Sequence, residues 1–229
     1  MDLSKSYEFF QPETVDGRIH IVGCGSVGSA LAELLARCGL TKLTLWDFDR
    51  VESHNISNQM FRSHDIGKLK VEALRDILTE INPEAKDDIE LEPNGWHGKI
   101  LSGYIFLCVD NIDIRRQIVE SHMNSPYVKA VFDFRTLLTN AQHYAADWGN
   151  FRQKKNLLAS MQFTNEEAMA ETPVSACGIT LGVVTTVRSI CELGVNNFLN
   201  FVRGKGLKTY VEFDGFHFAM MAFPMEDDE

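Results

Sequence analysis

The stretch RIHIVGCGSVG, residues 18–28, decides how this chain folds. Residues 18–22 form a short apolar run that ends in glycines, which is typical of a buried strand. Residues 29–38 follow with leucines at helical spacing and stop at Gly39, so they predict a helix. The next apolar run is residues 43–46. The chain therefore opens as strand–helix–strand, the unit from which parallel sheets are built.

The glycines between the first strand and the helix match the pattern G-x-G-x-x-G. Gly23 would permit a tight turn, Gly25 would let the backbone approach a phosphate or ribose, and Gly28 would let the helix pack on the strand. Asp47 ends the second strand, where a carboxylate can accept hydrogen bonds from ribose hydroxyls. The pattern predicts a nucleotide-binding, Rossmann-like domain. By itself it separates neither a dehydrogenase from an adenylating enzyme nor ligand binding from simple packing.

The rest of the chain predicts an α/β fold, a Rossmann-like and mostly parallel sheet flanked by helices, with antiparallel strands at the C-terminus. Apolar periodicity predicts helices over 67–81, 112–123 and 179–201, and strands over 104–109, 128–134, 140–147, 208–213 and 216–222. The helix 179–201 is apolar enough to pack on the sheet or at a subunit contact. Asp214-Gly215 signals a hairpin turn.

We interpret residues 1–229 as a single domain with five parts. These are an N-terminal extension (1–16), a nucleotide-binding core (17–147), a long crossing loop with a short helix near 165–170 (148–176), a helix and hairpin (177–224), and an acidic tail (225–229).

Composition excludes several classes of protein. A net charge of −10 argues against nucleic-acid binding, which depends on basic residues meeting phosphates. The five cysteines include no C-x-x-C pair, so no zinc is expected, and their scattered placement suits a reducing compartment. No apolar run reaches the ~18 residues of a membrane span. We expect a cytoplasmic protein with no membrane partner.

Three later motifs separate the nucleotide-binding classes. Residues 47–59 read DFDRVESHNISNQ, residues 65–74 read DIGKLKVEAL, and Asp110-Asn111 follows a buried strand. Together with the glycine pattern they resemble the ThiF/MoeB/HesA family, the catalytic core shared with ubiquitin-activating enzymes. The resemblance is close over residues 17–147 and looser through Cys177 and the apolar helix.

The resemblance implies ATP and Mg²⁺ as ligands and assigns roles to the motif residues. It places Asp47 on the ribose, Asn55 and Gln59 facing the nucleotide, Lys70 on the phosphates and Asp110 on Mg²⁺ near the α-phosphate, while Asp49 shapes the loop. Adenylation needs alignment and charge neutralisation more than covalent chemistry, and these residue types suit it.

Each role has a structural alternative. Lys70 could be a solvated helix residue, Asn55 a turn former, and Asp110-Asn111 a cap for the following helix. In thioester-forming relatives the nucleophile lies in the crossing loop or near its end, which makes Cys177 a candidate nucleophile. Its alternative is a small buried packing residue.

Two departures from the family pattern affect the expected activity. Asn58 stands where most catalytic members have an arginine before the glutamine, and Arg62 is a candidate replacement for that charge. The N-terminal region offers no arginine to a partner subunit, with Lys5 the nearby cation. These features suit either a divergent active subfamily or a binding protein with weakened catalysis.

The leading hypothesis is ATP-dependent adenylation of the C-terminal glycine of a small ubiquitin-like or sulfur-carrier protein, with or without subsequent thioester formation. The alternative is a non-catalytic ThiF-like nucleotide-binding or regulatory subunit. A nicotinamide-dependent oxidoreductase fits the glycine pattern and Asp47 but leaves the later motifs without a purpose. The resemblance also implies a homodimer, which the apolar helix supports.

Overall fold

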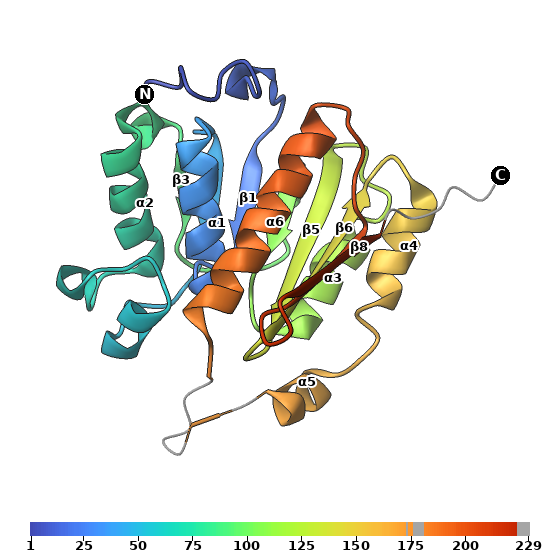
Figure 1. The fold of residues 1–229 in the computed structure, drawn as a ribbon. Coiled ribbons are helices and arrows are strands. Elements are labelled where there is room, and N and C mark those ends of the chain that lie inside the picture. The colour runs from blue at the N-terminus through green and yellow to red at the C-terminus, as the bar shows by residue number, and fades with distance from the viewer. Residues whose placement is uncertain (173, 176–180, 224–229) are drawn as a thin grey trace.

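The computed structural model describes residues 1–172, 174–175 and 181–223, and within them an eight-stranded sheet has one parallel half. In this half the strand order is β3-β2-β1-β4-β5 (Figure 1). The strands are β1 (Ile19–Val22), β2 (Leu43–Trp46), β3 (Glu90–Glu92), β4 (Gly103–Leu107) and β5 (Val128–Thr136). The chain runs outward from β1 to β2 and β3, then resumes on the other side at β4. This reversal makes the carboxyl ends of β1 and β4 a switch point, where open α/β sheets bind ligands.

The other half of the sheet is antiparallel. It adds β6 (Asn140–Asp147), β7 (Tyr210–Asp214) and β8 (Ala219–Phe223) in that order beside β5. The expected C-terminal hairpin is therefore present, and its turn includes Phe218 at a positive φ of 54°. The fold class predicted from the sequence is confirmed.

Helices cover both faces of this sheet (Figure 1). α1 (Ser26–Arg37), α2 (Lys70–Ile81) and α6 (Val184–Val202) lie on one face, while α3 (Ile112–His122) and α4 (Phe151–Ala159) lie on the other. α5 (Asn165–Glu171) lies beyond the end of the sheet at which the parallel strands finish. Short 3-10 turns η1 to η4 span Pro12–Thr14, Ser53–Ser57, Ser63–Asp65 and Pro83–Asp87.

Two hydrophobic cores result from the alternation of side chains along the strands. Ile21, Phe106 and Phe132 point into the core beneath α1 and α6. Ile105 and Val131 point into the core beneath α3 and α4. Because both faces are buried, the central strands β1, β2 and β4 are buried throughout and largely apolar, which is the pattern that the sequence shows.

α6 packs within the chain, on α1 and on the strands β5 to β7. Gly194 makes this approach possible, because a Cβ at that position would overlap the ring of Phe134. The helix begins at Val184, later than the expected residue 179. Apolar character alone does not define a helix start, and Gly182 with the β-branched Val183 disfavours an earlier turn.

The prediction of a mostly irregular segment over 148–176 is wrong. It contains the regular helix α4 in addition to the short helix α5, which was expected near 165–170. α4 buries Leu157, packs Leu158 partly against the core and leaves Phe151 exposed, so its apolar periodicity is weak. Its clearest sequence signal is Asn150, whose side chain caps the first turn by accepting from Arg152 and Gln153. None of the helices in the described ranges combines the length and apolarity needed to cross a bilayer.

Candidate functional site

The glycine turn joins β1 to α1, and its glycines have different structural duties. Gly23 has a φ of 95°, and a Cβ there would come within 2.7 Å of the amide nitrogen of Val109 at the end of β4. A Cβ on Gly28 would overlap the carbonyl oxygen of Gly23. A Cβ on Gly25 would meet no atom within 4 Å. Gly23 and Gly28 are thus required by packing, whereas Gly25 leaves open space above the turn.

The N-terminus of α1 faces that open space. Gly25 is its N-cap, and among the described residues no side chain bonds the backbone N–H groups of the first turn. Gly25, Ser26 and Val27 line a cavity. Unbonded N–H groups and the positive end of the helix dipole form a binding site for an anion such as phosphate.

Asp47 is fixed beside the glycine turn by two backbone amides. Cys24 N–H donates to its Oδ2 at 2.7 Å, and Asp49 N–H donates to its Oδ1 at 2.8 Å. Burial raises the pKa of the Asp47 carboxyl, although these hydrogen bonds and the charge of Lys70 oppose the rise. Each oxygen retains acceptor capacity for a ligand hydroxyl.

Lys70 is held in the same region by the loop after β2. Its Nζ lies 2.8 Å from Asp49 Oδ2, and its backbone N–H donates to the Asp49 carbonyl at 2.9 Å. Although Lys70 is the first residue of α2, its side chain is only 9% exposed. It is therefore not a solvated helix residue.

Asn55 and Gln59 follow on the turn η2. Asn55 accepts from Glu52 N–H at 2.9 Å, so it shapes the turn while also lining the cavity. Gln59 N–H donates to the Asn55 carbonyl, and the side-chain Oε1 of Gln59 is buried without a hydrogen-bond partner among the described residues. A buried acceptor without a partner is costly unless a ligand or water satisfies it.

The sequence allowed Asp110-Asn111 either to bind a ligand or to cap the following helix, and in the structure Asn111 is the cap. Asn111 caps α3, because its Oδ1 accepts from Asp113 and Ile114. Asp110 is exposed and lines the cavity. No hydrogen bond or ion pair in the described ranges engages its carboxylate, which leaves it available to a cation.

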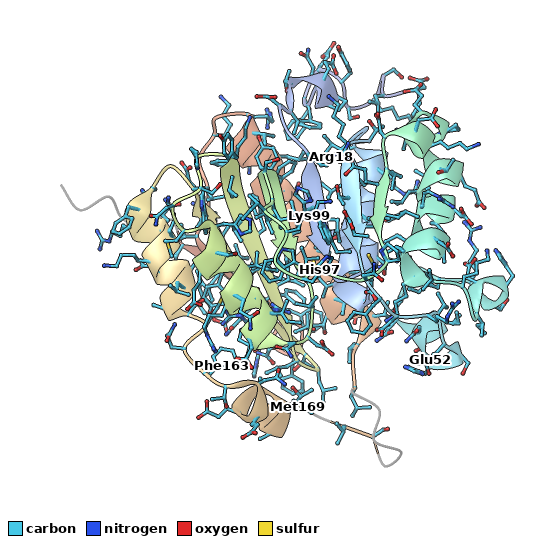
Figure 2. The ribbon with its side chains drawn as sticks, turned by 180° about the vertical axis from the view of Figure 1, so that it is seen from behind. Arg18, Glu52, His97, Lys99, Phe163 and Met169 are labelled. Carbon is cyan, nitrogen blue, oxygen red and sulfur yellow. The ribbon has the colours of Figure 1, made fainter. Side chains whose placement is uncertain are left out.

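These residues line one cavity of about 1390 Å³ at the carboxyl edge of the parallel strands. Of the motif residues predicted from the sequence and described by the structure, Gly23, Gly25, Asp47, Asp49, Asn55, Gln59, Lys70 and Asp110 come together, while Gly28 lies beneath the turn. The cavity continues along β5 and β6 to α5. Figure 2 shows Phe163 and Met169 at that end of the molecule, opposite Arg18, which precedes β1.

Comparison with known proteins identifies the family of this chain. The model of the ThiF family matches residues 8–229. The chain belongs to the ThiF family. Ubiquitin-like modifier-activating enzyme 5 of Caenorhabditis briggsae is 34% identical over 137 residues, covering 52% of the chain, and that of Drosophila willistoni is 43% identical over 138 residues. The matched region spans about a third of these relatives, 30% and 32%.

Solved structures share the fold of this ThiF-family chain. MccB of E. coli with ATP gives a TM-score of 0.72 at 14% identity, covering 93% of the chain and 65% of MccB. MccB with MccA gives the same TM-score over 95% of the chain and 67% of MccB. PaaA gives 0.68 at 16% identity over 98% of the chain and 69% of PaaA.

The arginine position of the family is occupied differently here. The side-chain amide nitrogen of Asn58 would lie 3.0 Å from a Cβ on Gly182, so Asn58 lies close to the segment leading into α6. Arg62 does not replace the missing charge. It forms an ion pair of 2.6 Å with Glu80 on α2 and does not line the cavity.

Sequence reasoning missed two arginines that do line the cavity, Arg115 and Arg135. Arg115 donates to Asp133 Oδ1 and to the Phe134 carbonyl, both at 2.6 Å, and its Nε donates to the Val109 carbonyl at 2.7 Å. It thereby fixes the backbone next to Asp110. Its sequence signal is its place one helical turn after Asn111.

The candidate nucleophile Cys177 lies outside the described residues. Of the other cysteines, Cys24 and Cys108 are close to the glycine turn, and burial raises the pKa of both thiols. A thiol held protonated is a poor nucleophile. These two cysteines are therefore packing residues.

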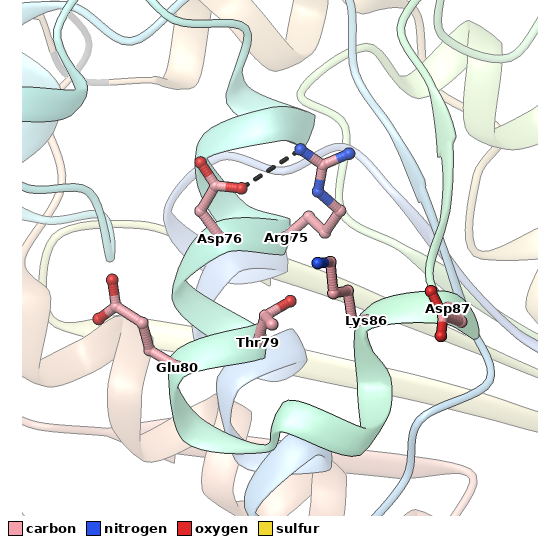
Figure 3. Close-up of a pocket in the computed structure, with 6 residues that line it drawn as sticks. All are labelled: Arg75, Asp76, Thr79, Glu80, Lys86 and Asp87. Atoms are coloured by element: carbon pink, nitrogen blue, oxygen red, sulfur yellow. Dashed lines mark hydrogen bonds and ion pairs between the residues drawn. The ribbon is translucent and has the colours of Figure 1, made fainter.

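Another hollow of about 430 Å³ lies on the outer side of α2 and η4 (Figure 3). Its lining is charged, and none of the sequence-predicted residues belongs to it. Its members are Arg75, Asp76, Thr79, Glu80, Lys86 and Asp87.

Proposed function

We propose that this chain uses ATP to adenylate the C-terminal carboxylate of a small ubiquitin-like or sulfur-carrier protein. The observation that carries the proposal is the convergence of the glycine turn, Asp47, Lys70 and Asp110 on one cavity at the sheet's switch point. Convergence from separate segments is expected of a nucleotide site and is not required for packing.

In the proposed reaction a carboxylate oxygen of the substrate attacks the α-phosphorus of ATP. A bond forms between that oxygen and phosphorus, the bond to the bridging oxygen breaks, and pyrophosphate leaves with the electron pair. Asp47 would hold the ribose, and the N–H groups of the first turn of α1 would hold phosphate. Lys70 would exchange Asp49 for phosphate oxygens, and the buried Gln59 Oε1 would gain a partner. These groups align and neutralise charge.

Mg²⁺ fits the residues at the end of β4. Asp110 offers an exposed carboxylate there, and Mg²⁺ is commonly held by one or two carboxylates together with substrate phosphates. When bound, the ion would withdraw charge from the phosphate oxygens. Asp110 would hold it, and Arg115 would keep the neighbouring backbone in place.

The size of the cavity supports a protein or peptide tail as the second substrate. Ligand pockets commonly occupy roughly 300–1,000 Å³, and this cavity is larger and continues past Asp110 to α5. A tail that ends in glycine suits a narrow path to the α-phosphate. The names of the relatives, which include ubiquitin-like modifier-activating enzymes and MccB solved with MccA, support the same kind of substrate.

Exchange of labelled pyrophosphate into ATP tests this function. We expect exchange that depends on a carrier with a free C-terminal glycine and that stops when that terminus is amidated. Clear ATP binding with no exchange for any glycine-ended carrier would contradict the adenylation step.

In the proposed sequence of reactions, a thioester between the carrier and Cys177 would follow adenylation. Cys177→Ser should leave exchange intact and remove a thiol-sensitive carrier adduct.

A non-catalytic nucleotide-binding subunit is the second candidate function. The observation that favours it is Asn58 in the arginine position, an uncharged side chain that lines the cavity. An inert protein that gains exchange with Asn58→Arg would support this candidate, and exchange by the unmodified protein would exclude it. Homodimerisation and a cytoplasmic location stay predictions, the first testable by light scattering at micromolar concentration.

A further inference from the structure

The wall of the cavity along β5 carries a buried ion-pair triad of Arg115, Asp133 and Arg135. The Asp133 side chain is fully buried, with Arg115 Nη1 at 2.6 Å from Oδ1 and Arg135 Nε at 2.8 Å from Oδ2. Burial by itself would raise the pKa of the Asp133 carboxyl, but the two arginines outweigh burial and lower it. The triad therefore keeps a net positive charge beside the cavity.

Hydrogen bonds and two aromatic rings fix the orientation of the Arg135 guanidinium. Its Nη1 and Nη2 donate to the carbonyl and hydroxyl of Ser160 at 2.8 and 2.9 Å. Its guanidinium lies 4.3 Å from the ring centre of Tyr144 and 5.5 Å from that of Phe163. Three of the five N–H donors of a guanidinium are thus engaged within the described residues, and two remain on a side chain that lines the cavity.

The order of strands gives Arg135 its place relative to the substrates. Along the carboxyl edge, β2, β1, β4 and β5 carry Asp47, the glycine turn, Asp110 and Arg135 in that order. Under the proposed function the first three positions take ribose, phosphates and the α-phosphate. The next position along the edge is where the group attached to the α-phosphate must lie.

We propose that Arg135 binds the acyl end of the substrate, its carboxylate before transfer and its acyl carbonyl oxygen in the adenylate. This inference rests on the proposed function and names a substrate-binding residue for it. A cation held rigidly in a largely buried position suits this task, because the side chain is already ordered in the free protein and loses little entropy when the ligand binds. It would also contribute positive charge at a site where Asn58 supplies none.

Arg116 provides a matched control. It holds the same segment as Arg135, because it donates to the Met161 carbonyl at 3.0 Å and to the Phe163 carbonyl, but it does not line the cavity. A loss shared by both variants would therefore come from release of residues 160–163. A loss seen with Arg135 alone would come from the ligand.

The test is calorimetric titration of the full chain with two probes. N-acetylglycyl sulfamoyl-adenosine mimics the acyl-adenylate, and adenosine 5′-sulfamate lacks the acyl group. We expect Arg135→Gln to weaken binding of the acyl mimic about tenfold, which is about 1.4 kcal/mol, and binding of the sulfamate less than twofold. Arg135→Lys should recover part of the loss, and Arg116→Gln should change neither affinity, with melting temperatures checking the fold of each variant.

Three outcomes would overturn the assignment of Arg135: equal weakening of both probes, no weakening, or the same loss with Arg116→Gln. They leave adenylation itself standing if the unmodified protein binds both probes. If the unmodified protein binds neither probe, the proposed function fails and the role of Arg135 falls with it.

Discussion

The two walls of the cavity are built in different ways. On the β1–β2 side the site is made of backbone: a glycine turn, a helix N-terminus and a carboxylate held by two amides. On the β5–β6 side it is made of side chains, with two arginines held by one buried carboxylate. We call the first the backbone wall and the second the side-chain wall. The backbone wall depends on local sequence, whereas the side-chain wall depends on residues that meet only after folding.

Removing Asp133 should break the side-chain wall with the largest effect. Asp133→Ala leaves Arg115 and Arg135 as unpaired, largely buried charges, and breaking a buried pair of this kind costs about 3–5 kcal/mol. Urea unfolding of the variant measures the loss. Asp113→Ala, which removes an exposed partner of Arg116, should cost less than about 1 kcal/mol. Similar losses for the two variants would contradict the importance of the triad.

In the backbone wall, substitution of Gly28 should affect the stability of the fold, whereas substitution of Gly25 should affect ATP binding. Gly28→Ala forces the Gly23 carbonyl to move and should destabilise the fold by about 3 kcal/mol, at the upper end of overpacking costs. Gly25→Ala places its methyl in open space, so it should leave the free energy of unfolding nearly unchanged and weaken ATP binding. Unfolding curves and ATP titration of both variants check the pair. The distinction is wrong if Gly25→Ala unfolds the protein while Gly28→Ala is tolerated.

Lys70 and Lys68 allow a sharper comparison of charge. Lys70 lines the cavity, whereas Lys68 lies outside it and pairs with Asp65 at 2.8 Å. Removal of one phosphate-stabilising charge typically costs about 10²–10³ in rate, so Lys70→Gln should slow pyrophosphate exchange about 100-fold. Lys68→Gln should stay within about twofold. Equal rates for Lys70→Gln and the unmodified protein would remove Lys70 from the site.

Most of the backbone wall could be predicted from the sequence, because the glycine spacing, Asp47, Asn55 and Asp110 follow local rules of turns and strand ends. The side-chain wall could not, since nothing in the periodicity of residues 128–136 shows that Asp133 pairs both with Arg135 on its own strand and with Arg115 on α3. The helix α4 escaped prediction for a related reason. It is stabilised by its Asn150 cap and one buried leucine more than by an apolar stripe.

Two histidines are buried within the sheet, so acid should weaken the fold. Burial lowers the pKa of His20, on β1, and of His143, on β6, to about 4. A folded-state pKa below the unfolded value of ~6.5 means that stability is complete above pH 6.5 and is lost as the pH falls toward 4. His143 alone should cost about 2 kcal/mol by pH 5.

Urea unfolding at pH 7 and pH 5 measures this loss. His143→Gln should reduce the difference between the two pH values, whereas His64→Gln, at an exposed position, should leave it unchanged. A pH difference that His143→Gln does not alter would show that other groups cause it.

The smallest effect is expected at Arg62. Its pair with Glu80 is exposed and lies outside the cavity, so Arg62→Gln should cost less than about 1 kcal/mol and leave exchange unchanged. A large loss of exchange with normal stability would mean that Arg62 leaves Glu80 and reaches the phosphates during the reaction.

The central claim is that separate segments converge on one Mg-nucleotide. A crystal structure with a nonhydrolysable ATP analogue and Mg²⁺ tests it most directly. We predict the ribose at Asp47, the phosphates between the α1 N-terminus and Lys70, and the α-phosphate beside Asp110. A nucleotide bound elsewhere, for example in the charged hollow between α2 and η4 (Figure 3), would contradict the account.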